Sequence, residues 1–314
     1  MTKLHLALLL VVTPAVAAAQ ENTRAPIIDM HLHGGYTVGA FRTGPDGAPM
    51  PRPCVPQPCV NHAAQVQKAE DILPMTLEAM KRHNIVLGIV SDRPPQILEW
   101  DKADPDRFML GFHMLHPSEI GIPRLRELFR SGEFQVLGEL GFQYRNVAID
   151  DSLLDPMFAM AAEMDIPVHI HLAGAGGGPT FPIHLGNPLR LSTVLQKHQN
   201  LRIYVENASW PFLEEITAVM YKYPNLYADL STITWISPRR TFHRYLQGLV
   251  ENGLSKRLMF GSDQMMWPET IALAIEAIET ADFLTEEQKR DIFYNNAARF
   301  LRLSEEEIAQ HHGK

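Results

Sequence analysis

The chain has 314 residues, a formal net charge of −8, and apolar and aromatic contents that are ordinary for a globular protein. An acidic surface argues against nucleic acid as a partner, because binding to phosphates needs clustered basic residues. The length suits either one large barrel or two medium domains.

Residues 1–19 are typical of a secretory signal. A basic start at Lys3 precedes an apolar run over 4–16, and Ala17–Ala19 supplies small residues for cleavage. The run is short for a membrane span, and an uncleaved anchor is the alternative reading. We therefore expect export to the periplasm and one domain over residues 20–314, without an integral membrane segment. Loss of Lys3 makes the formal charge −9.

Two cysteines, Cys54 and Cys59, lie in a proline-rich stretch. An oxidising compartment predicts a disulfide between them, provided that the turn geometry lets so short a loop close. The alternatives are a metal site, for which a second pair of cysteines is missing, and two free thiols.

Short apolar runs alternate with longer amphipathic segments from residue 26 onward. Most of the runs are continuously apolar, which is typical of buried parallel strands. The expected strands cover residues 26–31, 85–90, 108–113, 134–140, 166–171, 201–206, 225–230 and 257–262.

The segments between these runs carry helical periodicity. Such a series of β/α units predicts an α/β fold of the (β/α)8 TIM-barrel class more readily than an open doubly wound sheet. No glycine-rich phosphate fingerprint follows the first strand, so a dinucleotide-binding fold has no support. The expected helices cover residues 71–83, 94–102, 118–131, 152–164, 188–198, 211–223, 238–252 and 268–281, with a C-terminal helical extension at 285–301 and then a polar tail.

Two insertions, 34–70 and 173–187, are rich in glycine and follow strands. Both therefore lie on the C-terminal face of the expected barrel, where barrel enzymes keep their active sites. They are candidates for lids, although the glycines of the second suit a plain flexible connector equally well.

Imidazole and carboxylate side chains gather at the ends of the expected strands. His31 and His33 close the first strand, and residues i and i+2 of a strand point to the same side. Both rings therefore aim into the barrel mouth, close enough to share one metal ion. Glu139, His171 and Asp263 stand at the ends of the fourth, fifth and eighth strands, so they converge on the same axial site.

At this point the sequence resembles the amidohydrolase superfamily, in particular its amidohydrolase-2 branch, which also contains aromatic-acid decarboxylases. The resemblance spans nearly all of the chain beyond the signal. It is carried by the stretches IIDMHLH, IPVHIH, YPNLYADLS, RLMFGSD and QKRDIFYNNAARFL.

The resemblance implies roles for four residues. His31 and His33 match the metal ligands of the first strand, and His171 matches the ligand of the fifth. Asp263 matches a carboxylate that binds the metal and acts as general base toward the attacking water. Neutral imidazoles and one carboxylate leave net positive charge on a divalent ion, which lowers the pKa of bound water to about 7.

Two further residues have open roles. His169 is expected to support a ligand or to pack, in preference to binding the ion itself. Glu139 either bridges two ions, as a strand-4 carboxylate does in two-metal relatives, or hydrogen-bonds a metal ligand as a buried carboxylate.

One position departs from the family. Relatives carry a strand-6 histidine in a context like His-Ala-Gly-Trp-Pro, whereas this chain has Asn207 before Ala-Ser-Trp-Pro. Asparagine can polarise a carbonyl or hold an oxyanion, which keeps Asn207 a catalytic candidate, but it cannot shuttle a proton near neutral pH. The change predicts one tightly held metal ion rather than a two-metal site.

Four residues are candidates for substrate contacts, each with a structural alternative. Arg93 could pair with a substrate carboxylate or form a structural ion pair. His113 could enter the pocket or support its wall. Trp210 and Trp267 could line an apolar pocket or pack beneath the loops.

The leading hypothesis is a metal-dependent hydrolase in which metal-activated water attacks a small amide, ester or lactone. The second is a mononuclear-metal decarboxylase of a small aromatic acid. The third, motivated by Asn207, is a catalytically idle metal-containing binding protein. We expect one divalent ion, with zinc first and manganese or iron as alternatives, because imidazoles and a carboxylate suit all three. The substrate is a small molecule in the leading hypothesis, and the oligomeric state is open.

Overall fold

The computed structural model describes residues 24–35, 66, 68–174 and 180–313. The signal-like segment, both cysteines and parts of the two insertions lie outside these ranges, so signal cleavage and the Cys54–Cys59 disulfide stay predictions. Within the described ranges, no helix has the length and apolar character needed to cross a bilayer.

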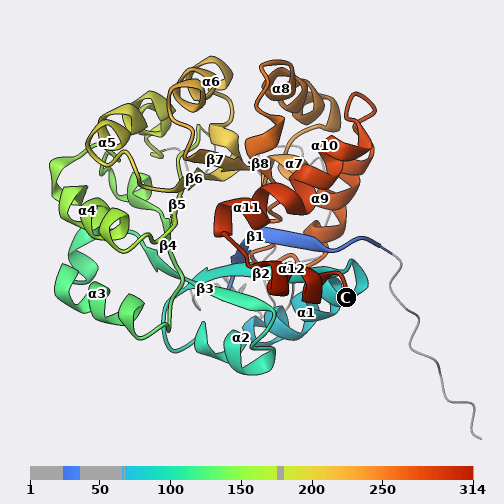
Figure 1. Ribbon diagram of the computed structural model, residues 1–314, viewed down its shortest axis with the longest axis horizontal. Helices are drawn as coiled ribbons and strands as arrows, with labels where there is room; N and C mark the ends of the chain where they lie inside the picture. The colour runs from blue at the N-terminus through green and yellow to red at the C-terminus, as the bar shows by residue number, and fades with distance from the viewer. Residues whose placement is uncertain (1–23, 36–65, 67, 175–179, 314) are drawn as a thin grey trace, which may run out of the picture.

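Eight parallel strands follow one another in chain order in a single sheet, which confirms the predicted TIM barrel (Figure 1). The two edges of the sheet also meet. The Met30 amide donates to the Phe260 carbonyl at 2.9 Å, and the Asp263 amide donates to the His31 carbonyl at 2.8 Å. The strands are β1 (Ile27–His33), β2 (Ile85–Asp92), β3 (Phe108–Met114), β4 (Val136–Leu140), β5 (Val168–Ile170), β6 (Ile203–Val205), β7 (Leu226–Asp229) and β8 (Leu258–Met259).

The later strands are shorter than their apolar runs predict. β8 ends at Met259, although the run continues to residue 262. The Phe260 amide bonds the Ile292 carbonyl at 2.8 Å instead of a neighbouring strand, and Asp263 adopts a positive φ of 48°. The strand therefore ends before Phe260, although the amide of Asp263 still bonds β1.

The predicted helices form a ring outside the strands (Figure 1). Three of them begin later than expected, because a short 3-10 turn precedes each: Pro117–Glu119, Ser152–Leu154 and Pro188–Arg190. The helices of the ring are α1 (Ile72–Arg82), α2 (Leu98–Ala103), α3 (Ile122–Arg130), α4 (Asp155–Glu163), α5 (Leu191–Lys197), α6 (Leu213–Lys222), α8 (Arg239–Glu251) and α9 (Thr270–Glu279), and the sequence analysis missed the short α7 (Ile233–Ile236).

The C-terminal extension is more helical than expected. The segment 285–301 divides into α10 (Glu286–Arg290), a π-helical turn and α11 (Asn296–Leu301). The polar tail predicted beyond it contains a helix that was not expected, α12 (Glu305–His311). A capping box begins this helix: the Glu307 amide donates to Ser304 Oγ at 3.2 Å, and the Ser304 amide donates to the Glu307 carboxylate at 2.6 Å.

α11 closes the N-terminal end of the barrel (Figure 1). Arg202, which directly precedes β6, donates from Nη1 to the Phe300 carbonyl at 2.6 Å. Apolar side chains of α11 and the preceding turn pack against inward-facing strand residues, and this group is called the lower core. Its buried members are Ile28, Met30, Leu87, Ile89, Val136, Tyr204, Met259, Tyr294, Ala297, Ala298 and Phe300.

Candidate metal centre

At the opposite end, His31 and His33 point to the same side of β1, as their spacing predicts, with their Nε2 atoms 3.2 Å apart. Asp263 Oδ1 lies 2.8 Å from His33 Nε2 and 3.8 Å from His31 Nε2. Glu139 Oε2 lies 3.6 Å and 3.8 Å from the same two nitrogens. Two donors that bind one ion at ~2.1 Å with a tetrahedral angle stand about 3.4 Å apart. The distances from the two imidazoles to Asp263 and Glu139 lie around this value, and these four side chains are called the first site.

The first site also contains buried carboxylate oxygens whose charge needs a positive partner. Asp263 Oδ1 and Glu139 Oε2 are buried, and the described residues donate no hydrogen bond to them unless the imidazoles beside them carry protons. A buried carboxylate without a cation is costly, and a bound metal ion would compensate for it. The residues present therefore fit a divalent ion. The side chain of His33 is 18% exposed, so solvent reaches the site beside this ring.

Glu139 reaches the site because β4 and β5 approach closely. Gly138 has a φ of 142°, and a Cβ at this position would lie 2.3 Å from the His169 carbonyl oxygen. Only glycine tolerates both the dihedral angle and the contact. The sequence Gly138-Glu139 thus places a carboxylate at the inner end of β4.

His31 is oriented by groups on its other side. Its Nδ1 lies 3.1 Å from Ser231 Oγ and 3.6 Å from Asp229 Oδ2. The Ser231 hydroxyl donates to Asp229 Oδ1 at 2.5 Å, so its oxygen can accept a hydrogen bond from His31 Nδ1. That arrangement keeps the lone pair of Nε2 directed into the first site, as supporting groups do for metal-binding histidines. Asp229 was not among the residues predicted for the site, although it ends an apolar strand.

Charge dominates the protonation of the first site. Burial opposes protonation of His31, but the carboxylates around it, Asp263 foremost, raise its pKa well above the usual value. His33 responds in the same way, again with Asp263 as the main carboxylate. Burial alone would raise the pKa of Glu139, yet the two imidazoles hold it well below its usual range. Without an ion, protons on the imidazoles balance the carboxylates, so a bound cation would displace them.

His169 is fully buried beneath the first site. Its ring stacks on Tyr204 with centroids 4.3 Å apart and meets His31 edge-on at 4.5 Å. Its Nε2 lies 3.4 Å from Asp229 Oδ2, and burial lowers its pKa. His31, His169 and Asp229 offer ligating atoms within 4.8 Å of one another. The packing under His31 is the supporting position expected for this histidine.

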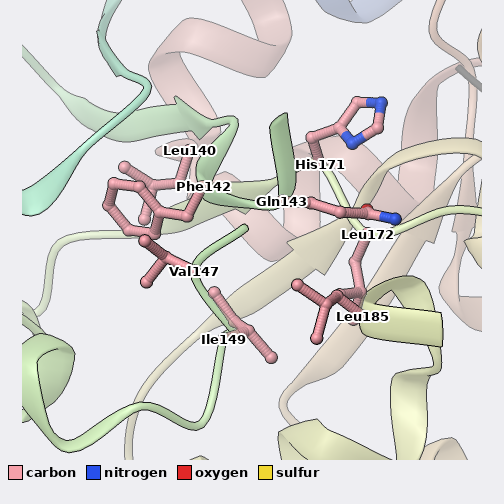
Figure 2. Close-up of a pocket in the computed structure, with 8 residues that line it drawn as sticks. All are labelled: Leu140, Phe142, Gln143, Val147, Ile149, His171, Leu172 and Leu185. Atoms are coloured by element: carbon pink, nitrogen blue, oxygen red, sulfur yellow. The ribbon is translucent and has the colours of Figure 1, made fainter. Parts of the chain in front are cut away.

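His171 lies outside the first site. Its Nε2 is 2.8 Å from the Tyr144 hydroxyl and 3.7 Å from Glu206 Oε1, and burial lowers its pKa to about 4. Among the described residues, it belongs to no group of three with ligating atoms within 4.8 Å. It borders a group of mostly apolar side chains, and Figure 2 shows its ring directed away from Val147 and Ile149.

Glu206, which the sequence analysis did not single out, enters the site directly after β6. It is 3% exposed, and its ligating atom and those of His31 and Glu139 lie within 4.8 Å of one another. Burial, followed by the charge of Glu139, raises its pKa well above the usual value. The available signal was its position, a lone carboxylate at the end of the apolar run LRIYVE.

Asn207 lies behind Glu206. Its Nδ2 donates to Glu206 Oε1 at 2.6 Å, and its Oδ1 accepts from the Ile233 amide at 3.2 Å. Asn207 and the two residues after it have φ values of 57°, 45° and 55°, a left-handed run that residues other than glycine rarely adopt. This turn positions the amide to hold Glu206.

Three of the four candidates for substrate contacts have structural partners. Arg93 forms the alternative ion pair, with Glu119. His113 is half-buried, and burial lowers its pKa although the charge of Glu139 opposes the shift. The apolar side chains between the strands and the helices form the main core, and Trp210 and Trp267 are partly buried against it. The Trp267 ring lies 5.9 Å from that of Trp235.

A closed barrel that gathers imidazoles and carboxylates at its C-terminal end defines a metal-dependent (β/α)8 enzyme class. The family model of the amidohydrolases, in its second branch, matches residues 28–303. The chain therefore belongs to the amidohydrolase family, as the strand-end motifs predict. This family is metal-dependent, and the buried groups described above could bind a metal ion.

Solved structures share the barrel at low sequence identity, which shows the fold alone. An uncharacterized TIM-barrel protein from Bordetella bronchiseptica is 21% identical with a TM-score of 0.61, over 80% of this chain and 88% of that one. An amidohydrolase from Burkholderia multivorans with bound zinc is 16% identical with a TM-score of 0.59, over 89% and 100%. A 2,6-dihydroxybenzoate decarboxylase from Rhizobium is 14% identical with a TM-score of 0.55, over 89% and 99%.

A curated relative matches part of the chain. The protein fluG of Emericella nidulans is 24% identical over 135 residues, which is 38% of this chain. The match spans 16% of the length of fluG.

Proposed function

We propose that this protein is a metal-dependent hydrolase that directs activated water at the carbonyl carbon of a small amide, ester or lactone. The observation that carries the proposal is the buried pairing of Asp263 Oδ1 with His33 Nε2 at 2.8 Å, beside His31 and Glu139. The zinc bound to the related Burkholderia multivorans barrel supports the metal requirement.

His31, His33, Glu139 and Asp263 would hold the ion. A divalent ion bound there would polarise the substrate carbonyl and lower the pKa of a coordinated water. The Thr232 hydroxyl donates to Asp263 Oδ2, which orients the carboxylate and leaves Oδ1 for the site. Asp263 then takes a proton from water as the oxygen–carbon bond forms. It returns that proton to the leaving nitrogen or oxygen as the bond to carbon breaks.

One contact favours hydrolysis over the alternative decarboxylation. The side chain that could have bound a substrate carboxylate, Arg93, pairs with Glu119. An uncharged amide, ester or lactone needs no such cation. Asp263 also argues against an idle protein, because it can carry the proton that Asn207 cannot.

Removal and restoration of metal tests the proposal. The purified chain is treated with a chelator, dialysed, and assayed with aryl esters, N-acyl amino acids and lactones before and after addition of Zn²⁺, Mn²⁺ or Fe²⁺. We expect hydrolysis to disappear with the metal and to return with at least one ion. Hydrolysis that survives metal removal contradicts the proposal. Release of carbon dioxide from a hydroxybenzoate panel, without any hydrolysis, would establish the decarboxylase instead.

A further inference from the structure

β1 contains a bulge between Asp29 and Leu32. Two residues of β1, Met30 and His31, lie opposite a single residue of β2, Ile89. A bulge changes the side to which the following side chains point, and it takes backbone groups out of the strand ladder. This bulge turns His31 into the barrel, so the groups that satisfy its backbone also hold a residue of the first site.

The side chain of Asp29 satisfies the bulge. Its Oδ1 accepts hydrogen bonds from the His31 amide at 3.1 Å and from the Ser262 amide at 2.9 Å, and the residue is fully buried. A buried amide needs such an acceptor, because water does not reach it. β8 ends at Met259, so its pairing with β7 stops before Ser262. One carboxylate oxygen therefore joins β1 to the segment after β8, directly before Asp263.

Two further hydrogen bonds complete this connection. The Asp263 amide donates to the His31 carbonyl at 2.8 Å, and the Tyr204 hydroxyl donates to the Met30 carbonyl at 3.1 Å. Tyr204 reaches the bulge from β6 on the other side of the barrel, whereas Asp29 contacts the backbone of both segments that carry the site. The backbone positions of His31 and Asp263 are thus fixed relative to each other.

We propose that Asp29 is a positioning residue of the metal centre. Its buried carboxylate holds the bulge of β1 against the segment after β8, and it thereby sets the spacing of His31 and Asp263. The inference rests on the proposed function, because it assumes that these two residues hold the ion. Loss of a group that orients metal ligands typically costs ~10–100-fold in metal affinity.

Binding of Co²⁺ to the folded full chain distinguishes this role from a merely structural one. The visible absorption bands of Co²⁺ depend on the geometry of its ligands, and a titration followed at these bands gives Kd. Asp29→Ala removes the acceptor of both amides, so Kd should rise ~10–100-fold and the bands should shift. Asp29→Asn keeps an acceptor oxygen in the same place, and it should restore both the Kd and the bands of the wild-type protein.

Asp291→Ala is the matched control. Asp291 is also buried, but it lies in the π-helical turn after α10, and its Oδ2 is 2.6 Å from Lys256 Nζ. Its removal should lower stability in urea without any change in the Co²⁺ bands or Kd. A loss of stability alone in Asp29→Ala, with the Kd and bands of the wild-type protein, overturns the inference. An equal loss of affinity in Asp29→Asn overturns it as well, because the charge of Asp29 would then matter and its hydrogen bonds would not.

Should Asp29→Ala fail to fold, a crystal structure of the wild-type chain with Co²⁺ decides the question. Asp29 Oδ1 bonded to both amides, with His31 and Asp263 on the ion, supports the inference; absence of either hydrogen bond or either ligand overturns it. A wild-type chain that binds no Co²⁺ refutes both this inference and the proposed function. Metal-dependent hydrolysis in a wild-type chain, with unchanged Co²⁺ binding in Asp29→Ala, retains the proposed function and removes the role of Asp29.

Discussion

The two ends of this barrel use the same strands but bury opposite kinds of side chain. At the N-terminal end, α11 covers the apolar lower core. At the C-terminal end, histidines and carboxylates are just as deeply buried, and several of their atoms lack hydrogen-bond partners among the described residues. Apolar burial stabilises by about 25 cal/mol per Å², whereas an unsatisfied buried polar group costs about 1–3 kcal/mol. The lower core therefore stabilises the fold. The buried polar groups at the C-terminal end lower its stability, but they are available to bind a ligand.

The largest effect on turnover should follow a change at the C-terminal end of the barrel. Asp263→Asn should lower kcat by ~10²–10⁴-fold, the usual contribution of a general base. The amide keeps the shape of the carboxylate and can still accept from Thr232, but it no longer balances a proton on His33, so urea unfolding should show some loss of stability in the metal-free protein. Stopped assays on a substrate from the hydrolysis panel measure kcat. Full turnover in this variant would show that Asp263 is not the general base.

A change in the lower core should do the reverse. Phe300 is 2% exposed, and its ring lies 5.4 Å from Tyr204 and 5.0 Å from Tyr227. Phe300→Ala should lower the free energy of unfolding by about 3–5 kcal/mol because it leaves a cavity. Metal content and kcat of the folded fraction should stay unchanged. Leu153→Ala is the exposed control, and its effect should be within about 0.5 kcal/mol. Loss of metal from folded Phe300→Ala would show that the two ends are coupled.

A bound metal ion should stabilise the C-terminal end of the barrel. At a free concentration about 100-fold above Kd, a ligand that binds only the folded state adds about 2.7 kcal/mol. Addition of Zn²⁺ or Mn²⁺ should therefore raise the thermal midpoint of the wild-type protein. In Phe300→Ala the metal should add a similar increment to the free energy of unfolding. His33→Ala should lose most of the increment, because His33 contributes one of the four donors of the first site. An equal increment in His33→Ala would place the ion elsewhere.

The smallest effect concerns pH at the closed end. His311 Nδ1 lies 2.9 Å from the Tyr294 hydroxyl, and burial lowers the pKa of this histidine below 6.5. Below pH 6.5 the unfolded chain then binds more protons than the folded chain, so stability is full above this pH and falls as pH decreases. His311→Asn should reduce the loss between pH 7 and 5 by less than about 1 kcal/mol, as measured by urea unfolding. His184→Asn, at an exposed position, is the control; an equal change there would contradict the assignment.

The fold was predictable because its signals are local. Each strand carries its own apolar run, each long helix its own periodicity, and the alternation of the two leaves few architectures. α12 was missed although its capping box, Ser304 with Glu307, is also local, because its segment is short and strongly polar. The ends of the strands were less predictable, because the apolar run in the sequence continues past the last residue that pairs with a neighbouring strand.

For the site, the sequence by itself determined that imidazoles and carboxylates end β1, β4, β5 and β8, and that His31 and His33 face the same way. Tertiary structure decided whether the two histidines face the inside or the outside of the barrel. Ile28 and Met30 join the lower core inside the barrel, while Leu32 joins the main core outside. Strict alternation would then turn His31 outward, but the register of β1 against β2 shifts between Asp29 and Leu32, and both histidines face inward.

Tertiary structure likewise decided the roles after β6. The left-handed run that begins at Asn207 lets Glu206 meet Glu139 and sets the asparagine behind it. His171 lies beside Glu206 instead of completing the tight set around His31. A sequence pattern places a residue at the end of a strand. The direction of its side chain depends on backbone dihedrals and strand register, and these are settled only when all eight strands pack together.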